Sequence, residues 1–235
     1  MSKPVPLQHG QYYHVYTRGN NRENIFVQER NYRYLLQLYA RHVTPVAETF
    51  AYCLLPNHVH FLVRIKDLTG LADPSGLKDS VEKHWSRAFR RLHVVVVPAE
   101  ASTPGGQLAK FNRILKKPSQ HFSNLFNAYA RAFNKAYNRT GALFQRPFGR
   151  IPVTSDAYFV HLVTYIHRNP QKHGLVDDFR AWPYSSYHVL RSTKPTRLQR
   201  DDVLAWFGGP AGLEAAHRQA IAAHLVDSLA PEDFD

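Results

Sequence analysis

Residues 47–65 read AETFAYCLLPNHVHFLVRI, and this stretch decides the fold. Two apolar runs rich in β-branched and aromatic residues flank Pro56 and Asn57, a pair typical of a turn. We therefore expect consecutive strands over residues 47–55 and 58–65. Side chains alternate between the two faces of a strand. In the second strand one face carries His58, His60, Leu62 and Arg64, and the other carries Val59, Phe61, Val63 and Ile65.

Further strands and helices are predicted on both sides of this pair. Residues 11–17 are β-branched and aromatic, which predicts a strand, and residues 29–42 carry apolar side chains at helical spacing. The other predicted segments are helices over 78–92, 119–138 and 155–169, a loop over 94–106 and an extended segment over 142–153. This order predicts an α+β fold, a ferredoxin-like antiparallel sheet with packed helices.

Two signals place the ends of the later helices. Gly141 follows the helix over 119–138, and glycine is a frequent helix stop. Asn169 precedes Pro170, and a residue before proline is biased away from helical backbone, so we expect the helix over 155–169 to end there. The buried stripe of that helix is expected to be Phe159, Leu162, Val163 and Ile166, with Tyr165 and Asn169 off the stripe.

The composition favours a polyanionic partner. The chain of 235 residues carries 30 Lys and Arg against 18 Asp and Glu, a formal net charge of +12. Such an excess attracts nucleic acid or an anionic membrane surface. The longest aliphatic run, residues 94–97, is too short to span a bilayer, so we expect no membrane partner. A single cysteine and an N-terminus without an apolar signal segment predict a reducing, cytoplasmic setting.

His58 and His60 form the first candidate site. Residues two apart on a strand point to the same face, so the two imidazoles can chelate one divalent ion. The chain has 14 histidines, and one pair at this spacing is also expected by chance. Taken alone, the pair is more often two sheet histidines that hydrogen-bond to their neighbours. The single cysteine excludes a zinc site built from several thiolates.

Tyr165 and Asn169 form the second candidate site. On a helix these residues lie one turn apart on the same face. A phenol beside an amide carbonyl can sit next to a metal, with the carbonyl as a hard oxygen ligand. The alternative reading of the same residues is a half-exposed tyrosine and an asparagine that ends a helix.

Basic and aromatic residues form the third candidate, a nucleic-acid surface. Positive side chains track phosphates, and aromatic faces stack on unpaired bases. Over residues 144–150 the two kinds alternate, which favours this reading over a merely solvated face. The candidate DNA-binding residues are Arg18, Lys83, Arg87, Arg90, Arg91, Arg131, Arg139, Arg146, Phe148 and Arg150.

Other enzyme classes lack their motifs in this sequence. It contains no GxSxG, no GxxxxGK[ST] and no GxGxxG. Many acidic residues lie near the end of the chain, away from the candidate sites. A nuclease that holds two metal ions with carboxylates therefore lacks an obvious ligand cluster.

Four segments together resemble one protein family. They are LLPNHVHFLV at 54–63, RTGALFQRPF at 139–148, YIHRNPQKHGLV at 165–176 and WPYSSY at 182–187. In this order they resemble the REP-associated tyrosine transposases, which belong to the HUH single-tyrosine transposases, named for a His-hydrophobe-His pair. The resemblance covers roughly residues 10–190 and favours metal ligation by the histidine pair over coincidence.

The resemblance implies an activity and a role for each site residue. It implies nicking and strand transfer of single-stranded DNA beside hairpins, through a 5′-phosphotyrosine intermediate and with Mg²⁺ or Mn²⁺ as cofactor. His58 and His60 match the metal ligands, Tyr165 matches the nucleophile, and Asn169 matches the residue that completes the metal site.

Two regions depart from the pattern of the family. Within a catalytic domain over residues 1–190, residues 67–106 are expected to be a variable insertion. Residues 191–235 are expected to be a helical appendage without catalytic groups, docked by Leu204, Trp206, Phe207, Leu213 and Leu225.

Alternatives to the nickase stay open on the sequence. A non-catalytic, domesticated protein could bind DNA or RNA hairpins with the same fold, although such a binder has no need for an intact set of site residues. An HUH replication or conjugation initiator would share the chemistry and differ in its target. A monomer and a homodimer are both compatible with the sequence.

Overall fold

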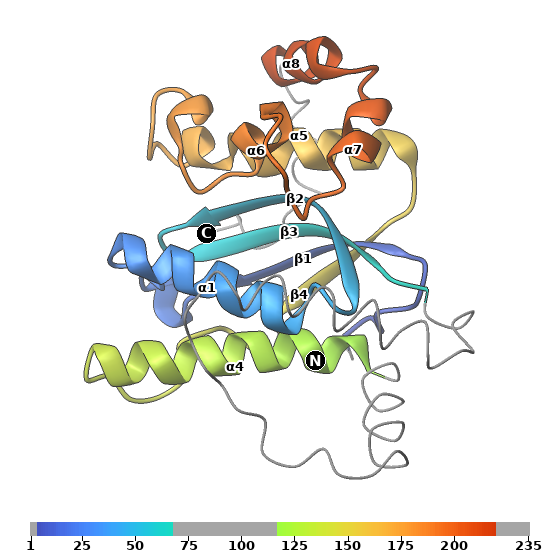
Figure 1. Ribbon diagram of the computed structural model, residues 1–235. Helices are drawn as coiled ribbons and strands as arrows, with labels where there is room; N and C mark the ends of the chain where they lie inside the picture. Colours follow the sequence, from blue (N-terminus) through green and yellow to red (C-terminus); the bar gives the residue numbers. More distant parts are fainter. Residues whose placement is uncertain (1–3, 68–116, 220–235) are drawn as a thin grey trace.

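A four-stranded antiparallel sheet forms the centre of the computed structural model, which describes residues 4–67 and 117–219 (Figure 1). The strands are β1 (Tyr12–Arg18), β2 (Ala47–Leu55), β3 (His58–Ile65) and β4 (Gly149–Val153). Their order is β2-β3-β1-β4, and each neighbouring pair is antiparallel. Helix α1 (Glu29–His42) links β1 to β2, and α4 (Pro118–Ala136) precedes β4. The predicted ferredoxin-like α+β fold is confirmed.

Helices α1 and α4 cover one face of the sheet (Figure 1). Val59, Phe61 and Val63 of β3 point to this side and are fully buried against the two helices. Helix α4 buries one apolar face in the same cluster, made of residues at helical spacing: Phe122, Leu125, Phe126, Tyr129 and Phe133.

The C-terminal half of the described chain covers the other face (Figure 1). Its helices are α5 (Asp156–Lys172), α6 (Tyr187–Arg191), α7 (Arg200–Trp206) and α8 (Pro210–Arg218). Leu62 of β3 is buried here with Leu162 and Ile166 of α5. Val203 of α7 and Leu213 of α8 are buried in the same cluster. None of the helices in the described residues has the length and hydropathy needed to cross a membrane.

The segment over 182–187 runs along β2. The indole N–H of Trp182 donates to the carbonyl of Leu54 at 2.9 Å, and the amide of Leu54 donates to the carbonyl of Tyr184 at 3.0 Å. The amide of Ser186 donates to the carbonyl of Tyr52 at 2.9 Å. These bonds satisfy backbone groups that the edge of the sheet would otherwise leave open. Two 3₁₀ turns, η1 (Asn20–Arg22) and η2 (Phe179–Ala181), complete the described elements.

The first half of the predicted elements agrees with the structure almost residue by residue. The helix over 29–42 and the strands over 47–55 and 58–65 have the predicted bounds, and β1 begins and ends one residue later than predicted. Within residues 142–153, only Gly149–Val153 is a strand. The predicted helix over 78–92 and loop over 94–106 lie outside the described residues.

Both predicted helix ends are wrong. Helix α4 ends at Ala136, and Asn138, with φ 48°, takes the left-handed backbone soon after it. Asparagine can do so because its short polar side chain tolerates this region. Helix α5 does not end before Pro170 but continues to Lys172. Proline lacks one amide, so the helix loses one backbone bond at Pro170. The helix nevertheless continues, and at its end the amide of His173 donates to the carbonyl of Asn169 at 3.0 Å.

Candidate active site

His58 and His60 share the face of the sheet that α5 covers, as their alternation on β3 predicts. Both side chains are buried. Their ring centroids are 4.9 Å apart, and the ring planes are nearly perpendicular, at 89°. Two imidazoles at this separation can converge on one ion.

Hydrogen bonds orient both imidazole rings. Nδ1 of His58 lies 2.6 Å from the side-chain oxygen of Asn57. An amide oxygen only accepts, so Nδ1 donates and Nε2 carries the lone pair. Nδ1 of His60 lies 2.9 Å from Nε2 of His14. When Nδ1 of His60 donates this bond, its Nε2 carries the lone pair, as in His58. Metal-ligating histidines are commonly held by such a second bond, so both rings fit a ligand role.

Helix α5 brings Tyr165 to the histidines. The ring centroid of Tyr165 lies 5.8 Å from that of His60 and 6.2 Å from that of His14, in edge-to-face geometry. The ammonium group of Lys172 lies 5.3 Å from the centre of the tyrosine ring. The structure therefore brings the Tyr165 ring and the Lys172 cation of α5 next to His60 of β3 and His14 of β1.

The expectation that Tyr165 and Asn169 stand off the buried stripe is wrong. Their side chains are 2% and 0% exposed. Together with Leu162 and Ile166 they follow the i, i+3, i+4, i+7 pattern of one helix face. The buried stripe of α5 is wider than its apolar residues indicate, because this helix packs against the sheet on one side and against α8 on another.

Asn169 carries a buried oxygen that needs a partner. Its side-chain nitrogen donates to the carbonyl of Tyr165 at 3.2 Å. Its side-chain oxygen is buried and accepts no hydrogen bond from the described residues. Leaving a buried acceptor unsatisfied costs about 1–3 kcal/mol. A hard cation is one species that would satisfy it.

The donor set at this site is small. Among residues 4–67 and 117–219, no three histidine, cysteine, aspartate or glutamate side chains converge as metal ligands. The predicted ligands, two imidazoles and one amide oxygen, would leave further positions for phosphate and water. This mixed set fits Mn²⁺ and, since magnesium prefers oxygen, fits Mg²⁺ less closely.

His14 is the site residue that the sequence analysis missed. It is fully buried on β1, and its ring stacks on His60 with centroids 5.1 Å apart. The ring of Tyr16 lies 5.0 Å from His14 on the same face. The only signal in the sequence was a histidine inside an apolar strand. That His14 lies beside His60 depends on the register of β1 against β3, in which Tyr16 pairs with His60.

Tyr129 and Tyr137 have structural roles on the opposite face of the sheet. The hydroxyl of Tyr129 donates to the carbonyl of Ile25 at 2.5 Å, and burial raises the pKa of this phenol far above its ordinary value. The hydroxyl of Tyr137 donates to the side-chain oxygen of Asn31 at 2.9 Å. Both pack with the cluster under α1 and α4.

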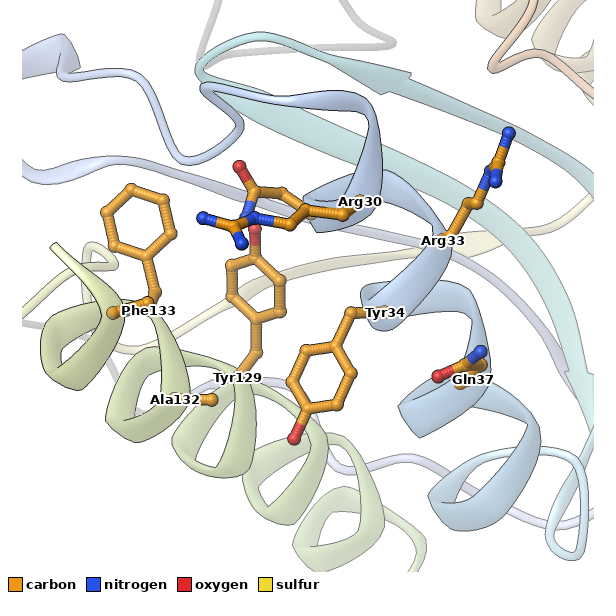
Figure 2. A pocket seen from close by; sticks show the side chains of 9 residues that line it. Arg30, Arg33, Tyr34, Gln37, Tyr129, Ala132 and Phe133 are labelled. Atoms are coloured by element: carbon orange, nitrogen blue, oxygen red, sulfur yellow. The ribbon is translucent and has the colours of Figure 1, made fainter. Parts of the chain in front are cut away.

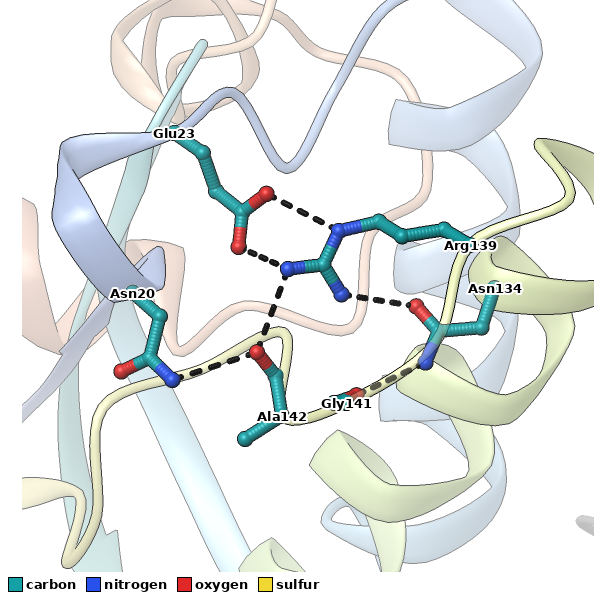
Figure 3. Close-up of polar contacts among 6 residues, drawn as sticks. All are labelled: Asn20, Glu23, Asn134, Arg139, Gly141 and Ala142. Atoms are coloured by element: carbon teal, nitrogen blue, oxygen red, sulfur yellow. Dashed lines mark hydrogen bonds and ion pairs between the residues drawn. The ribbon is translucent and has the colours of Figure 1, made fainter.

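Arg139, a candidate DNA-binding residue, makes protein contacts (Figure 3). Its guanidinium forms a two-pronged ion pair with the carboxylate of Glu23. It also donates to the side-chain oxygen of Asn134 at 3.0 Å and to the carbonyl of Ala142 at 3.2 Å. These bonds hold the loop after α4 in place, and DNA contact by Arg139 stays a prediction.

The other candidate DNA-binding residues fall into three groups. Arg18 ends β1 and pairs in register with His58. Four lie outside the described residues: Lys83, Arg87, Arg90 and Arg91. Four more line one open groove of about 700 Å³, which we call the basic groove: Arg131, Arg146, Phe148 and Arg150.

A second hollow, of about 440 Å³, lies between α1 and α4 (Figure 2). Tyr34 and Tyr129 face it from the two helices, whereas Arg33 points away and pairs with Glu29. Its lining includes no residue of the predicted sites.

The comparisons with known proteins give one relative and one solved structure of interest. No protein-family model matches the chain. A protein of Haemophilus influenzae, whose curated name assigns it provisionally to the REP-associated tyrosine transposases, is 26% identical over 163 residues. The match spans 69% of this chain and 68% of the relative. The solved structure of a REP-associated tyrosine transposase bound to a REP hairpin aligns with a TM-score of 0.49 and 17% identity, over 83% of this chain and 88% of that one. The resemblance indicated by the four motifs is thus confirmed, and the chain is similar in sequence to a REP-associated tyrosine transposase.

Proposed function

We propose that this protein is a metal-dependent, transposase-like enzyme that nicks single-stranded DNA at hairpin-flanked sites and transfers the strand through a 5′-phosphotyrosine intermediate. The proposal rests on the position of Tyr165, whose ring centroid lies 5.8 Å from that of His60. The similarity to a protein named as a tyrosine transposase supports the same class.

His58, His60 and Asn169 would hold the divalent ion, either Mg²⁺ or Mn²⁺. The buried side-chain oxygen of Asn169 and the lone pair on Nε2 of His58, which follows from the bond of Nδ1 to Asn57, support this assignment. When bound, such an ion withdraws charge from a non-bridging oxygen of the scissile phosphate. The hydrogen bonds to Asn57 and His14 hold both imidazoles in one orientation.

Tyr165 is the proposed nucleophile. Its phenolic oxygen forms a bond to phosphorus, the bond from phosphorus to the 3′ oxygen breaks, and that oxygen leaves as a 3′-OH after taking up a proton. The phosphotyrosine link keeps the energy of the broken bond available for rejoining, so no nucleotide cofactor is needed. The ammonium group of Lys172 lies 5.3 Å from the centre of the Tyr165 ring, so a positive charge stands close to the proposed nucleophile.

The burial of Tyr165 favours a second candidate function. At 2% exposure, the ring is covered by protein, and DNA must displace neighbouring groups to reach its hydroxyl. A protein that binds hairpins without cutting them would have no need for such movement. The two candidates differ in one property, since only the enzyme forms a covalent bond to DNA.

Cleavage by histidine variants tests the proposal. Wild-type protein, His58→Ala and His60→Ala would be incubated with a hairpin-bearing single strand and Mn²⁺, and Mn²⁺ affinity would be measured separately by calorimetry. We expect both variants to lose cleavage and to bind Mn²⁺ at least about tenfold more weakly, because each loses an imidazole ligand. His188→Ala is the matched control, since that histidine is exposed and away from the site.

Two results would contradict the metal assignment: full cleavage by wild-type protein in EDTA, or unchanged Mn²⁺ affinity in His58→Ala. Hairpin binding by wild-type protein without any cleavage would instead support the non-catalytic candidate.

A further inference from the structure

The basic groove lies on the face of the sheet opposite Tyr165. Its floor includes Thr17 of β1, and one wall is formed by residues of α4. In register, Thr17 pairs with Val59, the residue between the two candidate metal ligands. Paired residues point to the same face, so Thr17 and Val59 both point away from His58 and His60. The groove and the candidate active site are therefore back to back at the same end of the sheet.

Two buried polar groups in the groove have no hydrogen-bond partner among residues 4–67 and 117–219. The Thr17 side chain is only 3% exposed, and its hydroxyl makes no hydrogen bond with the described residues. Nε of Arg150, on the edge strand β4, is also buried and unpartnered within that part of the chain. A buried hydroxyl and a buried guanidinium nitrogen each cost free energy when unsatisfied. Both groups can donate a hydrogen bond, so an acceptor would satisfy them together.

The charge of the groove specifies the kind of acceptor. Arg131, Arg146 and Arg150 line it, and none of the described residues that line it is acidic. The guanidinium of Arg150 lies 3.9 Å from the centre of the Phe148 ring, and burial lowers the pKa of this arginine. A partly desolvated cation without a carboxylate is a strong attractor for an anion. Asn127 accepts from Arg146 at 2.8 Å, which positions that guanidinium.

A polyanion suits the groove better than a single small ion. Three guanidinium groups line the open groove, together with the Phe148 ring and amide side chains. Positive groups that follow a line of phosphates, with an aromatic face beside them, are typical of sites for unpaired nucleic acid.

We propose that the basic groove binds the phosphodiester backbone of single-stranded DNA on the face of the sheet opposite Tyr165. The strand that reaches the active site would then pass around the edge strand β4. The identification of the anion as DNA rests on the proposed function, whereas the existence of an anion site rests on Thr17, Arg150 and the arginines beside them.

The test measures binding of a fluorescent oligothymidylate by anisotropy, over a range of salt concentrations. All proteins carry Tyr165→Phe, so no covalent bond can form. We expect Arg150→Ala to weaken binding on the order of tenfold and to reduce the salt slope by about one, because one phosphate contact is lost. Thr17→Val should also weaken binding, and Thr17→Ser, which keeps the hydroxyl, should restore it.

Arg180→Ala is the control of equal charge, since Arg180 is exposed and pairs with Asp178 on the other face of the molecule. It should bind like the parent protein. Arg131→Ala provides a second groove variant at an exposed position, should Arg150→Ala fail to fold. Equal effects of the groove variants and Arg180→Ala would overturn the inference.

The failure of the groove and the failure of the proposed enzyme are distinguishable. Covalent adducts formed by the Tyr165 protein, together with groove variants that bind like Arg180→Ala, would refute the groove alone. An absence of adducts together with weakened binding by the groove variants would refute the nuclease and support the groove.

Discussion

His58 and His60, the two proposed metal ligands, are oriented by different kinds of contact. His58 is fixed by Asn57, its neighbour in the same turn, so the sequence PNHVH already contains this contact. His60 is fixed by His14, which comes from another strand. A local contact survives changes elsewhere in the fold, whereas the contact to His14 depends on the register of β1 and β3.

The ion pair of Arg139 and Glu23 predicts a measurable stability cost. Its side chains are 24% and 32% exposed, and the guanidinium also binds Asn134 and Ala142 (Figure 3). We expect Arg139→Ala to lower the free energy of unfolding by about 1–3 kcal/mol, because a partly buried carboxylate and a carbonyl lose their donors. Urea denaturation measures the change.

The matched comparison is Arg33→Ala on α1. Arg33 pairs with Glu29 one turn away, but the side chains are 71% and 60% exposed. Exposed pairs of this kind contribute only about 0.3–0.5 kcal/mol. If both variants lose the same small amount, the Glu23 network has no structural role beyond that of a surface pair.

At the scale of elements, α5 shows what the sequence could and could not predict. The strands over 47–55 and 58–65 followed from apolar, β-branched and aromatic runs on the two sides of Pro56 and Asn57, which are local features of the chain. The burial of Tyr165 did not follow, because it depends on a helix being enclosed by a sheet and by α8. The sequence also did not predict that α5 continues through Pro170, because tertiary packing can offset the one backbone bond that proline removes.

The candidate site was only partly predictable for the same reason. His58, His60, Tyr165 and Asn169 were found through local motifs, and the structure brings Tyr165 to His60. His14 has no motif of its own, because its proximity to His60 arises from strand pairing between distant segments.

A chain of neutral side chains ties α5 to α8. Nδ1 of His217 bonds to the carbonyl of Leu213 at 2.7 Å, so its Nε2 accepts from Nδ1 of His167 at 2.8 Å. Nε2 of His167 then accepts from the hydroxyl of Ser186 at 2.7 Å. Every ring nitrogen has a partner while both imidazoles are neutral. Burial lowers the pKa of His217 to about 4 and lowers the pKa of His167 well below its ordinary value.

This network predicts that stability falls in mild acid. Unfolded histidine binds a proton near pH 6.5, whereas folded His217 does so only near its pKa of about 4. The contribution of neutral His217 to the free energy of unfolding is therefore complete above pH 6.5. It is lost as the pH falls toward 4, at about 1.4 kcal/mol per pH unit for each histidine of this kind. Urea denaturation at pH 7.5 and pH 5 measures the loss. His217→Gln should reduce it, and an equal loss in that variant would show that other groups are responsible.

At the scale of the whole molecule, the two faces of the sheet have different roles (Figure 1). One face is covered by α1 and α4 and carries the basic groove along β4. The other is covered by α5 to α8 and carries the candidate active site. Residues 191–235 remain proposed as a helical appendage. Helices α7 and α8, which lie within this range, contribute to the buried cluster between α5 and the sheet.

Removing a buried side chain of α8 should destabilise the molecule. Leu213 is fully buried, so Leu213→Ala is expected to lower the free energy of unfolding by about 2–5 kcal/mol through lost burial and an internal cavity. Leu175→Ala is the control, since Leu175 is 39% exposed and should change stability by about 0.5 kcal/mol or less. A negligible effect of Leu213→Ala on thermal unfolding would mean that α8 does not stabilise the rest of the fold.

The most direct test of the central claim is to identify the residue that becomes covalently attached to DNA. The protein would be incubated with a hairpin-bearing single strand and Mn²⁺, digested, and analysed by mass spectrometry. We expect the adduct on the peptide that contains Tyr165. Tyr165→Phe should fold and bind DNA without forming any adduct, because only the hydroxyl is removed, and Tyr158→Phe should still form one. An adduct on a peptide that contains Tyr129, Tyr137 or Tyr158 instead would contradict the assignment.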